Sequence, residues 1–504
     1  MDKTGEKNVP LVARGMAKKG ALPIGLSAHF VGIGGIGISA LARWFLAQNW
    51  AVTGSDLADS QIIRDLIKSG IKVKIGHKTV NLPKKGPNMV IYSAAVPKNN
   101  PELIAALKRG IKPLSYPEVL GCLTKVYKTI GIAGSHGKST TTAMAGLILR
   151  KAGLDPNVVV GTNLKEFKGT NFRSGNSKFL VLESDEWKAS FLNYFPEIAV
   201  VTNIDKEHLD YYKTFGNVKK TFLKFLANVK TGGFLVLNRD DEVLWSLQSP
   251  ISQIANRKSL KIFWYSANVR GSRFEVRTLR KILKVSGRHN LSNAMAALAV
   301  AKILKVPERI ALKALSEFHG TWRRMEYRGK LQIANSRIGI RQKKNHLQSA
   351  ISSALVYDDY AHHPTEIKAT LGAFREKFEE NPIICVYQPH QAKRLKALFR
   401  DFVDAFHGAD ILVLLPVYEV AGRDKFNSSF TSKKLADAIK KAYPQKEVYY
   451  LNNPKQIKSF IVKVLPGKPS ASSIPTASGP SGLSPIVVMM GAGDIVKITP
   501  LLLS

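Results

Sequence analysis

The sequence predicts an α/β protein of about three domains, each with a mostly parallel sheet covered by helices. Three observations support this fold class. The chain has 504 residues, whereas one compact domain holds roughly 150. Strand-like apolar segments alternate with segments of helical periodicity along most of the chain, which is typical of βαβ units. Two glycine-rich turns each connect a predicted strand to a predicted helix.

The alternation divides the chain into three regions. In the first region we expect strands over Ala28–Val31, Trp50–Ser55 and Met89–Ser93, and helices over Ile38–Gln48 and Leu103–Arg109. In the second we expect strands over Lys128–Ala133, Lys178–Glu183 and Ile198–Asn203, and helices over Ser139–Lys151, Phe215–Val229 and Asn290–Leu304. In the third, which begins after Trp322, we expect strands over Ile383–Gln388, Ile411–Pro416 and Ile486–Met490.

Two segments interrupt this order. Leu331–Leu355 is polar and basic with no clear period, and Lys463–Ser484 is rich in proline, serine and glycine. We expect both to be insertions, the second of them a surface loop or a disordered segment.

The composition narrows the class of protein. A formal net charge of +38 attracts polyanions in general, but no aromatic-basic recognition motif is visible, so we expect no specific nucleic-acid partner. The longest apolar runs are shorter than the ~20 residues of a spanning helix, and the first 28 residues lack the pattern of a signal peptide. Two lone cysteines, Cys122 and Cys385, fit a reducing cytoplasm.

The first glycine-rich turn suits a diphosphate. Gly32, Gly34, Gly35 and Gly37 follow a strand and open a helix, and Asp56 ends the next strand. In this arrangement the glycines let the backbone approach a pyrophosphate, and the acid accepts ribose hydroxyls. On this motif alone, a nicotinamide-dependent dehydrogenase and a turn without a ligand remain open.

The second turn suits the phosphates of ATP. It reads Gly134, Ser135, His136, Gly137, Lys138, Ser139 and Thr140, between an apolar strand and a helix. Amides at the helix start can surround phosphate, the Lys138 ammonium can offset its charge, and the Ser139 hydroxyl can bind Mg²⁺. The turn lacks the first glycine of the strict phosphate-loop pattern, so a simple glycine turn beside a surface lysine is the alternative.

Further polar residues lie at predicted strand ends and at one helix start. Glu183 and His208 each follow an apolar strand, where open α/β sheets bind ligands, and they are candidate ligands of divalent metal ions. Asn290 and Asn293 open a helix and can pair with an adenine edge. A dense cluster over Asp358–Pro364, and Arg394 beyond the strand ending at Gln388, are candidates for holding a small charged substrate.

Taken in order, these motifs resemble the Mur ligase family of peptidoglycan synthesis. The resemblance runs from about His29 to Ile495 and rests on seven ordered matches. They are residues 29–37, residues 134–139, residues 201–210, residues 287–290, residues 323–326, residues 359–364 and residues 490–495. The complete first glycine turn is similar to that of the alanine-adding branch rather than the branch that recycles murein peptides.

This resemblance implies three domains after a basic extension over residues 1–27. They are a Rossmann-like UDP-sugar domain over 28–126, a central ATPase domain with a phosphate loop over 127–320, and a C-terminal Rossmann-like domain that binds the amino acid over 321–504. It implies a cytoplasmic ATP- and Mg²⁺-dependent ligase that joins L-alanine to UDP-N-acetylmuramate through an acyl phosphate, acting as a monomer or homodimer. A carboxylate must be activated before an amine can attack it, and that activation needs charge stabilisation.

The resemblance also implies roles for single residues. Lys138 contacts the phosphates, Ser139 and Glu183 hold one Mg²⁺ and His208 the other, Asn290 and Asn293 lie near adenine, and Asp359 lies near the ribose. The glycines of the first turn, Asp56, Ser93 and Arg324 lie along the UDP-sugar, and Tyr360, His362 and Arg394 surround the amino acid. Of these, Lys138, Glu183, His208 and His362 are the residues implied to be catalytic.

The chain departs from the family pattern at two places. After residues 388–390 the family usually has an arginine that grips the amino-acid carboxylate, where this chain has Gln391. After Glu183-Ser184-Asp185-Glu186, residues 187–189 are Trp-Lys-Ala where the family usually has Ser-Asp-Gly, so Glu186 is a second candidate for the metal carboxylate. Two alternative hypotheses follow: a ligase with altered amino-acid preference, and a basic binding protein on a decayed ligase scaffold.

Overall fold

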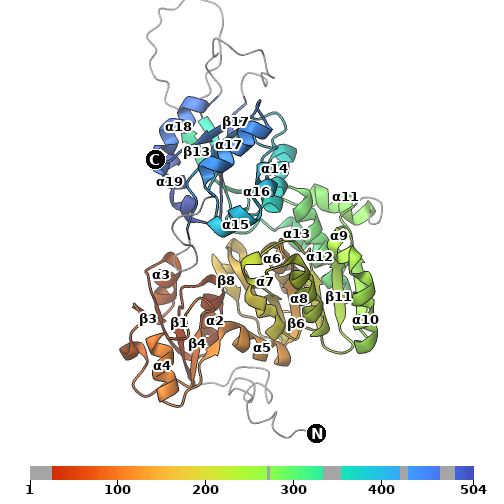
Figure 1. Cartoon of the computed structure of the whole chain (residues 1–504). Helices are drawn as coiled ribbons and strands as arrows, with labels where there is room; N and C mark the ends of the chain where they lie inside the picture. The colour runs from red at the N-terminus through yellow and green to blue at the C-terminus, as the bar shows by residue number, and fades with distance from the viewer. Residues whose placement is uncertain (1–24, 269–272, 333–352, 420–429, 466–482, 504) are drawn as a thin grey trace, which may run out of the picture. The chain divides into compact units, whose positions relative to one another are not determined.

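The structure is a computed structural model that describes residues 25–268, 273–332, 353–419, 430–465 and 483–503 (Figure 1). The chain forms two compact units. Unit 1 comprises Met1–Lys284 and Asn290–Thr321, and unit 2 comprises Val285–His289 and Trp322–Ser504. Within the described ranges, no helix is long and apolar enough to cross a membrane.

Unit 1 begins with a five-stranded parallel sheet in the order β3-β2-β1-β4-β5. Its strands are β1 (Ser27–Val31), β2 (Ala51–Asp56), β3 (Lys72–Ile75), β4 (Met89–Tyr92) and β5 (Leu114–Ser115). Its helices are α2 (Ile36–Ala47), α3 (Gln61–Lys68), η2 (Thr79–Asn81), α4 (Pro101–Lys108) and α5 (Tyr116–Val126).

Local capping explains where three of these helices begin. The side chain of Ser60 accepts a hydrogen bond from the Ile63 amide at the start of α3. Asn100 caps α4, whose first residue is Pro101, and Ser115 and Glu118 form a capping box at α5. Each cap satisfies amides that the first turn of a helix leaves without a partner.

The second sheet of unit 1 has seven strands in the order β12-β11-β10-β6-β9-β7-β8, parallel except for the antiparallel β7–β8 pair. Its strands are β6 (Lys128–Ala133), β7 (Asn157–Leu164), β8 (Thr170–Arg173), β9 (Phe179–Glu183), β10 (Ile198–Val201), β11 (Phe234–Asn238) and β12 (Lys261–Tyr265). Its helices are α6 (Lys138–Lys151), η3 (Lys165–Phe167), η4 (Trp187–Asn193), α7 (Leu209–Tyr212), α8 (Phe215–Ala227), α9 (Glu242–Ser246), α10 (Gln248–Lys258), α11 (Arg273–Ile282), α12 (Arg288–Ile303) and α13 (Glu308–Ser316).

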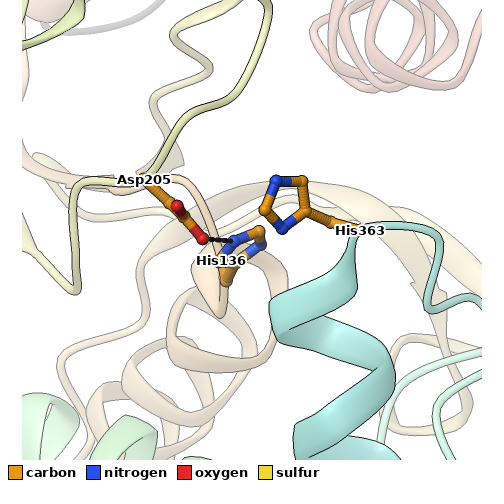
Figure 2. Close-up of side chains that lie close together, drawn as sticks. All are labelled: His136, Asp205 and His363. Carbon is orange, nitrogen blue, oxygen red and sulfur yellow. Dashed lines mark hydrogen bonds and ion pairs between the residues drawn. The ribbon is translucent and has the colours of Figure 1, made fainter. Parts of the chain in front are cut away.

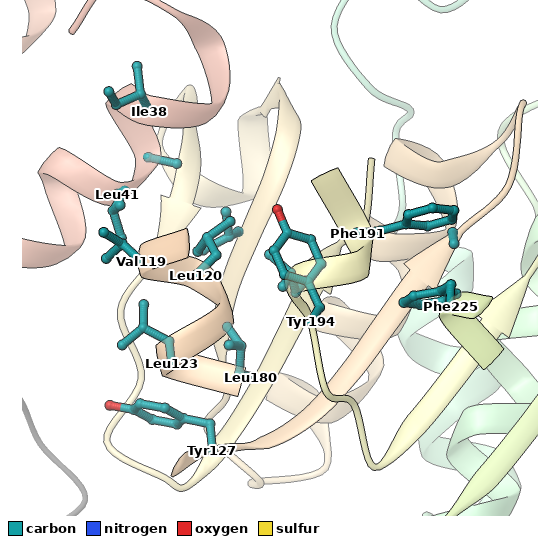
Figure 3. Close-up of a cluster of buried hydrophobic side chains, with 14 of the residues drawn as sticks. Ile38, Leu41, Val119, Leu120, Leu123, Tyr127, Leu180, Phe191, Tyr194 and Phe225 are labelled. Carbon is teal, nitrogen blue, oxygen red and sulfur yellow. The ribbon is translucent and has the colours of Figure 1, made fainter. Parts of the chain in front are cut away.

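One hydrophobic core joins the two sheets of unit 1. Figure 3 shows side chains of α2 and α5 gathered with Leu180 of β9 and with Tyr194 beyond η4. Phe191 stacks on Phe225 of α8 with ring centroids 4.7 Å apart. The side-chain amide of Asn171 in β8 also donates to the Ile36 carbonyl at the start of α2. The first glycine turn is therefore fixed to the second sheet through α2.

Unit 2 is built on a six-stranded sheet in the order β13-β14-β18-β15-β16-β17, parallel except for the β13–β14 hairpin. Its strands are β13 (Glu326–Gln332), β14 (Ser353–Asp359), β15 (Ile383–Tyr387), β16 (Ile411–Leu414), β17 (Glu447–Tyr450) and β18 (Ile486–Met490). Its helices are α14 (Pro364–Lys377), α15 (Ala392–Ala397), α16 (Phe399–Val403), α17 (Ser432–Ala442), η5 (Pro454–Gln456), α18 (Ile457–Val464), η6 (Asp494–Lys497) and α19 (Thr499–Leu503). Two apolar clusters, one on each face, bury the strands.

The predicted α/β class is confirmed, and each predicted strand or helix matches an observed one within a few residues at its ends. Residues at the ends of both predicted insertions lie in observed elements. Leu331 and Leu355 belong to the paired strands β13 and β14, where Leu331 is buried in one of the two apolar clusters and Leu355 packs against the other, and Lys463 belongs to α18. The stretches between, residues 333–352 and 466–482, lie outside the described residues.

We predict that Trp44→Ala will lower the free energy of unfolding by about 3–5 kcal/mol, because it removes a large buried side chain. Trp44 is 0% exposed, and its ring lies 5.4 Å from that of Tyr127 and 5.8 Å from that of Phe172. Urea denaturation measures the change. Trp245→Ala is the control, since Trp245 is 38% exposed and should cost about 1 kcal/mol. Equal losses would contradict a core shared by the two sheets.

Candidate functional site

The first glycine turn lies where the strand order of the first sheet reverses. Strand β1 is paired with β2 on one side and β4 on the other, so the chain leaves β1 at the carboxyl edge between them. Open parallel sheets bind ligands at this point. Helix α2 starts here with Gly35 as its N-cap, and no side chain caps its first amides. Those amides can therefore bind an anion.

The turn is closely packed by the residues predicted to accompany it. Gly32 has a φ of +74°, and a Cβ there would lie 2.8 Å from Val96 and 3.1 Å from Ser93. The Asp56 carboxylate accepts a hydrogen bond from the Gly34 amide at 2.8 Å. The structure thus brings the glycines, Asp56 and Ser93 together, as predicted. Gly37, in the first turn of α2, faces the Tyr116 ring.

The second glycine turn connects β6 to α6. Gly137 is the N-cap of α6 with a φ of +83°, and a Cβ there would lie 2.3 Å from the Asn293 side-chain oxygen. That oxygen also accepts a hydrogen bond from Thr141 at 3.2 Å. Only glycine fits between the loop and helix α12, which carries Asn290 and Asn293. Thr140 lies in the first turn of α6.

The loop after β10 holds the second turn in place. The His136 amide donates to the Asn203 side chain at 2.8 Å, and the His136 ring lies 2.9 Å from an Asp205 oxygen (Figure 2). The Asp205 amide donates to the Ser135 hydroxyl at 2.8 Å, and Thr202 donates to the His136 carbonyl at 2.6 Å. These contacts fix the turn before any ligand arrives.

Lys138 lies over the turn and faces a buried carboxylate. Its ammonium donates to the carbonyls of Gly134 at 2.7 Å and Ser135 at 3.1 Å, and it lies 2.8 Å from a Glu186 oxygen. Burial opposes the charge of Lys138, but Glu186 and Asp185 outweigh burial and raise its pKa. The lysine is therefore a fixed cation at the second glycine turn.

Glu183 ends β9 beside Ser139. The Ser139 hydroxyl donates to one oxygen of Glu183 at 3.0 Å, and the Gly161 amide donates to the other at 2.6 Å. Burial raises the pKa of Glu183, with Lys138 and the Gly161 amide opposing the shift. The structure thus brings together Ser139 and Glu183, the pair predicted for one metal ion.

The second metal candidate, His208, faces Glu186 instead of Glu183. Its Nε2 atom lies 3.6 Å from a Glu186 oxygen, and Asp185, Glu186 and His208 each place one ligand atom within 4.8 Å of the others. Glu186 is 1% exposed, and one of its oxygens faces the Lys138 ammonium at 2.8 Å. Burial raises the pKa of Glu186 to about 7, with Lys138 opposing the shift.

Unit 2 carries the residues predicted for the ribose and the amino acid. Asp359, which ends β14, is 1% exposed and accepts hydrogen bonds from the amides of Met325 and Ala361, both at 2.8 Å. Thr370 donates to the same carboxylate at 3.2 Å. Burial raises the pKa of Asp359, with Arg324 opposing the shift. Within unit 2, the Asp359 carboxylate thus ties the residue before β13, Met325, to the loop after β14, which contains Ala361.

Arg324 and His362 share one carboxylate, that of Glu366 on helix α14. The Arg324 guanidinium lies 3.3 Å from Glu366, over the Tyr360 ring, and His362 Nδ1 lies 3.1 Å from the other Glu366 oxygen. Arg324, predicted along the UDP-sugar, is thus grouped within unit 2 with Tyr360 and His362. Figure 2 also labels His363, the N-cap residue of α14.

Arg394 lies in helix α15, which follows strand β15 of unit 2. Its guanidinium is 3.4 Å from His390 Nδ1, and the His390 ring stacks on Tyr418 at 5.5 Å. Gln391, at the departure from the family pattern, has a φ of +69° and donates its amide to the Tyr418 carbonyl. The backbone at Gln391 is thus fixed by the neighbouring strand end.

Sequence reasoning missed several residues that shape the site of unit 1. Asn203 and Asp205 orient the second glycine turn, and the Gly161 amide orients Glu183. Asn203 and Asp205 were within a matched motif, and their position after a buried strand could have identified them. Gly161 lies inside strand β7, which the sequence analysis did not predict, so no local signal pointed to it.

The fold and site define a ligase of the Mur type, and the chain belongs to the Mur ligase family. Three models of the family match it. The model described as the Mur ligase family catalytic domain matches residues 27–128, and the Mur ligase middle domain matches residues 132–301. The Mur ligase glutamate ligase domain matches residues 345–468. The predicted family and three-domain architecture are confirmed.

Individual relatives narrow the comparison. A UDP-N-acetylmuramate–L-alanine ligase from Desulforapulum autotrophicum is 37% identical over 492 residues, covering 94% of this chain and 97% of that protein. The ligase of the same name from Caldicellulosiruptor bescii is 37% identical over 488 residues, with the same coverage. A crystal structure of UDP-N-acetylmuramate-alanine ligase from Thermotoga maritima has a TM-score of 0.69 and 25% identity, covering 95% of this chain and 98% of that one.

We predict that the buried Glu186 makes the ligand-free protein less stable as the pH rises. The native-state pKa of about 7 lies above the ordinary value of 4.5, so the folded protein holds this proton more tightly than the unfolded chain does. The stabilisation is complete below about pH 4.5 and is lost as the pH rises through about 7.

Glu186→Gln removes this titration. The wild type and Glu186→Gln each have a free energy of unfolding, and the wild-type value minus the variant value is the quantity of interest. This difference should fall by up to about 3 kcal/mol between pH 4.5 and 7.5. Urea denaturation at a series of pH values measures this difference. Glu308→Gln, at an exposed helix position, is the control. A wild-type minus Glu186→Gln difference that does not change with pH would contradict the prediction.

Proposed function

We propose that this chain is an ATP-dependent UDP-N-acetylmuramate–L-alanine ligase. The two relatives described above, whose alignments cover 94% of this chain, carry that name. The observation that carries the proposal is the placement of two anion-binding turns in one compact unit. The turn after β1 suits the diphosphate of a UDP-sugar, and the turn after β6, with Lys138, suits the phosphates of ATP. A dehydrogenase would use the first turn and leave the second without a purpose.

The acidic residues near Lys138 fit Mg²⁺ on chemical grounds. Glu186 is buried with one oxygen 2.8 Å from Lys138 and the other 3.6 Å from His208, and the Ser139 hydroxyl and Glu183 offer further oxygen ligands. Hard oxygen donors are those that Mg²⁺ prefers, and His208 is an imidazole that a divalent ion also accepts. We propose that Ser139 and Glu183 hold one ion and that Glu186 and His208 hold the other. When bound, Mg²⁺ would offset the negative charge on the transferred phosphoryl group.

Phosphoryl transfer comes first. A carboxylate oxygen of the muramyl group attacks the γ-phosphorus of ATP, the bond from that phosphorus to the β–γ bridging oxygen breaks, and ADP leaves. Lys138 and the amides at the start of α6 stabilise charge on the phosphate oxygens. Asn290 and Asn293 hold the adenine, and Asp359 contributes at the ribose. The glycines of the first turn, with Asp56 and Ser93, hold the UDP-sugar still during this step.

Amide formation follows. The amino group of alanine attacks the acyl carbon, the C–O bond to phosphate breaks, and inorganic phosphate leaves with that oxygen while the amine loses a proton. We assign His362, Tyr360 and Arg394 to the amino acid and Arg324 to the UDP-sugar. Gln391 offers an amide where a guanidinium would form two charge-assisted hydrogen bonds, so we expect weaker binding of the alanine carboxylate than an arginine would give.

We also propose the domain boundaries that the sequence predicts, which are 28–126, 127–320 and 321–504. Each range contains one of the three sheets. We assign the UDP-sugar to the first range, ATP to the second and the amino acid to the third. Because ATP and the UDP-sugar are nucleotides of the cell interior, we place the reaction in the cytoplasm.

The test is phosphate release from Mg-ATP. We predict release that requires both UDP-N-acetylmuramate and alanine, and less release when glycine or serine replaces alanine. Lys138→Ala should reduce the rate by at least 100-fold, the order expected when transition-state charge loses a preorganised partner, and should leave the Kd for UDP-N-acetylmuramate nearly unchanged.

Three other outcomes would contradict the proposal. Release with a different amino acid would keep the ligase chemistry and overturn the alanine assignment. Loss of UDP-sugar affinity together with turnover in Lys138→Ala would contradict separate sites. No release from folded protein would favour a basic binding protein on a ligase scaffold.

A further inference from the structure

Lys188 lies on a turn that reaches from the second sheet of unit 1 to the first. This turn follows the buried Glu186 and forms the first part of η4. The Lys188 ammonium donates a hydrogen bond to the Ala94 carbonyl at 3.2 Å. Ala94 follows β4, at the edge where the strand order of the first sheet reverses. A cation from the ATP-binding part of the unit is thus brought to the candidate sugar site.

The Ala94 carbonyl belongs to a tight turn that packs on the first glycine turn. The Val96 amide donates to the Ser93 carbonyl at 2.9 Å, which closes this turn around Ala94. Val96 and Ser93 are the side chains that a Cβ at Gly32 would meet, at 2.8 Å and 3.1 Å. The Lys188 ammonium therefore lies at the rim of the glycine turn.

The backbone of Lys188 is held in an unfavourable conformation. Lys188 has φ and ψ of 51° and 29°, and Ala189 has 57° and 29°. Two successive left-handed residues other than glycine are unusual, and such backbone persists only when its surroundings hold it. Here the Ala189 amide donates to the Glu186 carbonyl at 2.9 Å, and Ser190 donates to the Trp187 carbonyl at 2.7 Å. The turn thus presents Lys188 in one direction.

The glycine turn itself carries no positively charged side chain. Residues 32–39 contain neither lysine nor arginine, and the N-terminus of α2 supplies only about half a positive charge. A diphosphate carries more negative charge than this helix end can offset. A nearby ammonium that gives up a backbone carbonyl for a phosphate oxygen supplies a full charge and a stronger hydrogen bond.

We propose that Lys188 binds the diphosphate of the UDP-sugar, and so ties the turn after Glu186 to the substrate held by the first glycine turn. This inference rests on the proposed function, since it takes a UDP-sugar as the ligand of the first sheet. It predicts that the positive charge of Lys188, rather than the net charge of the protein, contributes affinity for the diphosphate.

The test is calorimetric titration of the protein with UDP and with UDP-N-acetylmuramate, without ATP. Lys188→Met should raise the Kd for both ligands about tenfold, as expected for loss of one charge-assisted hydrogen bond, and Lys188→Arg should restore most of the affinity. The Kd for ATP should stay unchanged. Lys305→Met is the matched control. Lys305 is also an exposed lysine with a positive φ of 56°, and it follows the end of α12, about 20 Å along the helix axis from Asn290.

The outcomes separate this inference from the proposed function. Unchanged affinity in Lys188→Met, or an equal loss in Lys305→Met, would overturn the inference while leaving the ligase proposal standing. A loss seen with UDP-N-acetylmuramate but absent with UDP would also overturn it, because the contact would then be to the muramyl carboxylate. Wild-type protein that binds neither ligand would overturn the proposed function.

Discussion

The buried ion pair between Lys138 and Glu186 is the interaction on which the site of unit 1 depends. The two side chains are 13% and 1% exposed, and their charged atoms lie 2.8 Å apart. A buried charge without a partner is costly, so each group needs the other in the ligand-free protein. In the proposed reaction each group gains a new partner of opposite charge. The Lys138 ammonium binds phosphate oxygens, and the Glu186 carboxylate binds a divalent cation. The pair therefore holds both side chains in place until substrates exchange those partners.

The fold places this pair by ordinary means. Three adjacent strands, β10, β6 and β9, end at the same edge of the second sheet and deliver the Asp205 loop, the Lys138 turn and Glu183. Glu186 follows β9 on a turn that the stacked Phe191 and Phe225 fix in the core. The same core continues into helices α2 and α5 of the first sheet. One compact unit thus carries both anion-binding turns, which is what the transfer between two bound substrates requires.

The sequence predicted the parts of this arrangement that depend on local patterns. Strand, glycine turn and helix follow one another at Gly32–Gly37 and at Gly134–Ser139, and the structure has both turns at strand ends. The pairing of Glu186 with His208 could not be predicted, because it depends on how the turn at Lys188 and Ala189 folds back.

Long-range pairing accounts for the other misses. Strands β7 and β8 form a hairpin at the edge of the second sheet, and β13 pairs with β14 across residues 333–352. What places a strand in such a pair is its contact with neighbours distant in the sequence, and a local pattern does not show these contacts. The same reason explains why the Gly161 amide on β7 was missed as a partner of Glu183.

The most direct measurement of the central claim follows the oxygen atoms. UDP-N-acetylmuramate labelled with ¹⁸O in its muramyl carboxylate would be incubated with the protein, Mg-ATP and alanine, and the released phosphate analysed by mass spectrometry. If the carboxylate attacks ATP and alanine then displaces the phosphate, each phosphate released carries one ¹⁸O atom. Unlabelled phosphate would mean that water attacks ATP, and would contradict activation of the sugar carboxylate at the Lys138 site.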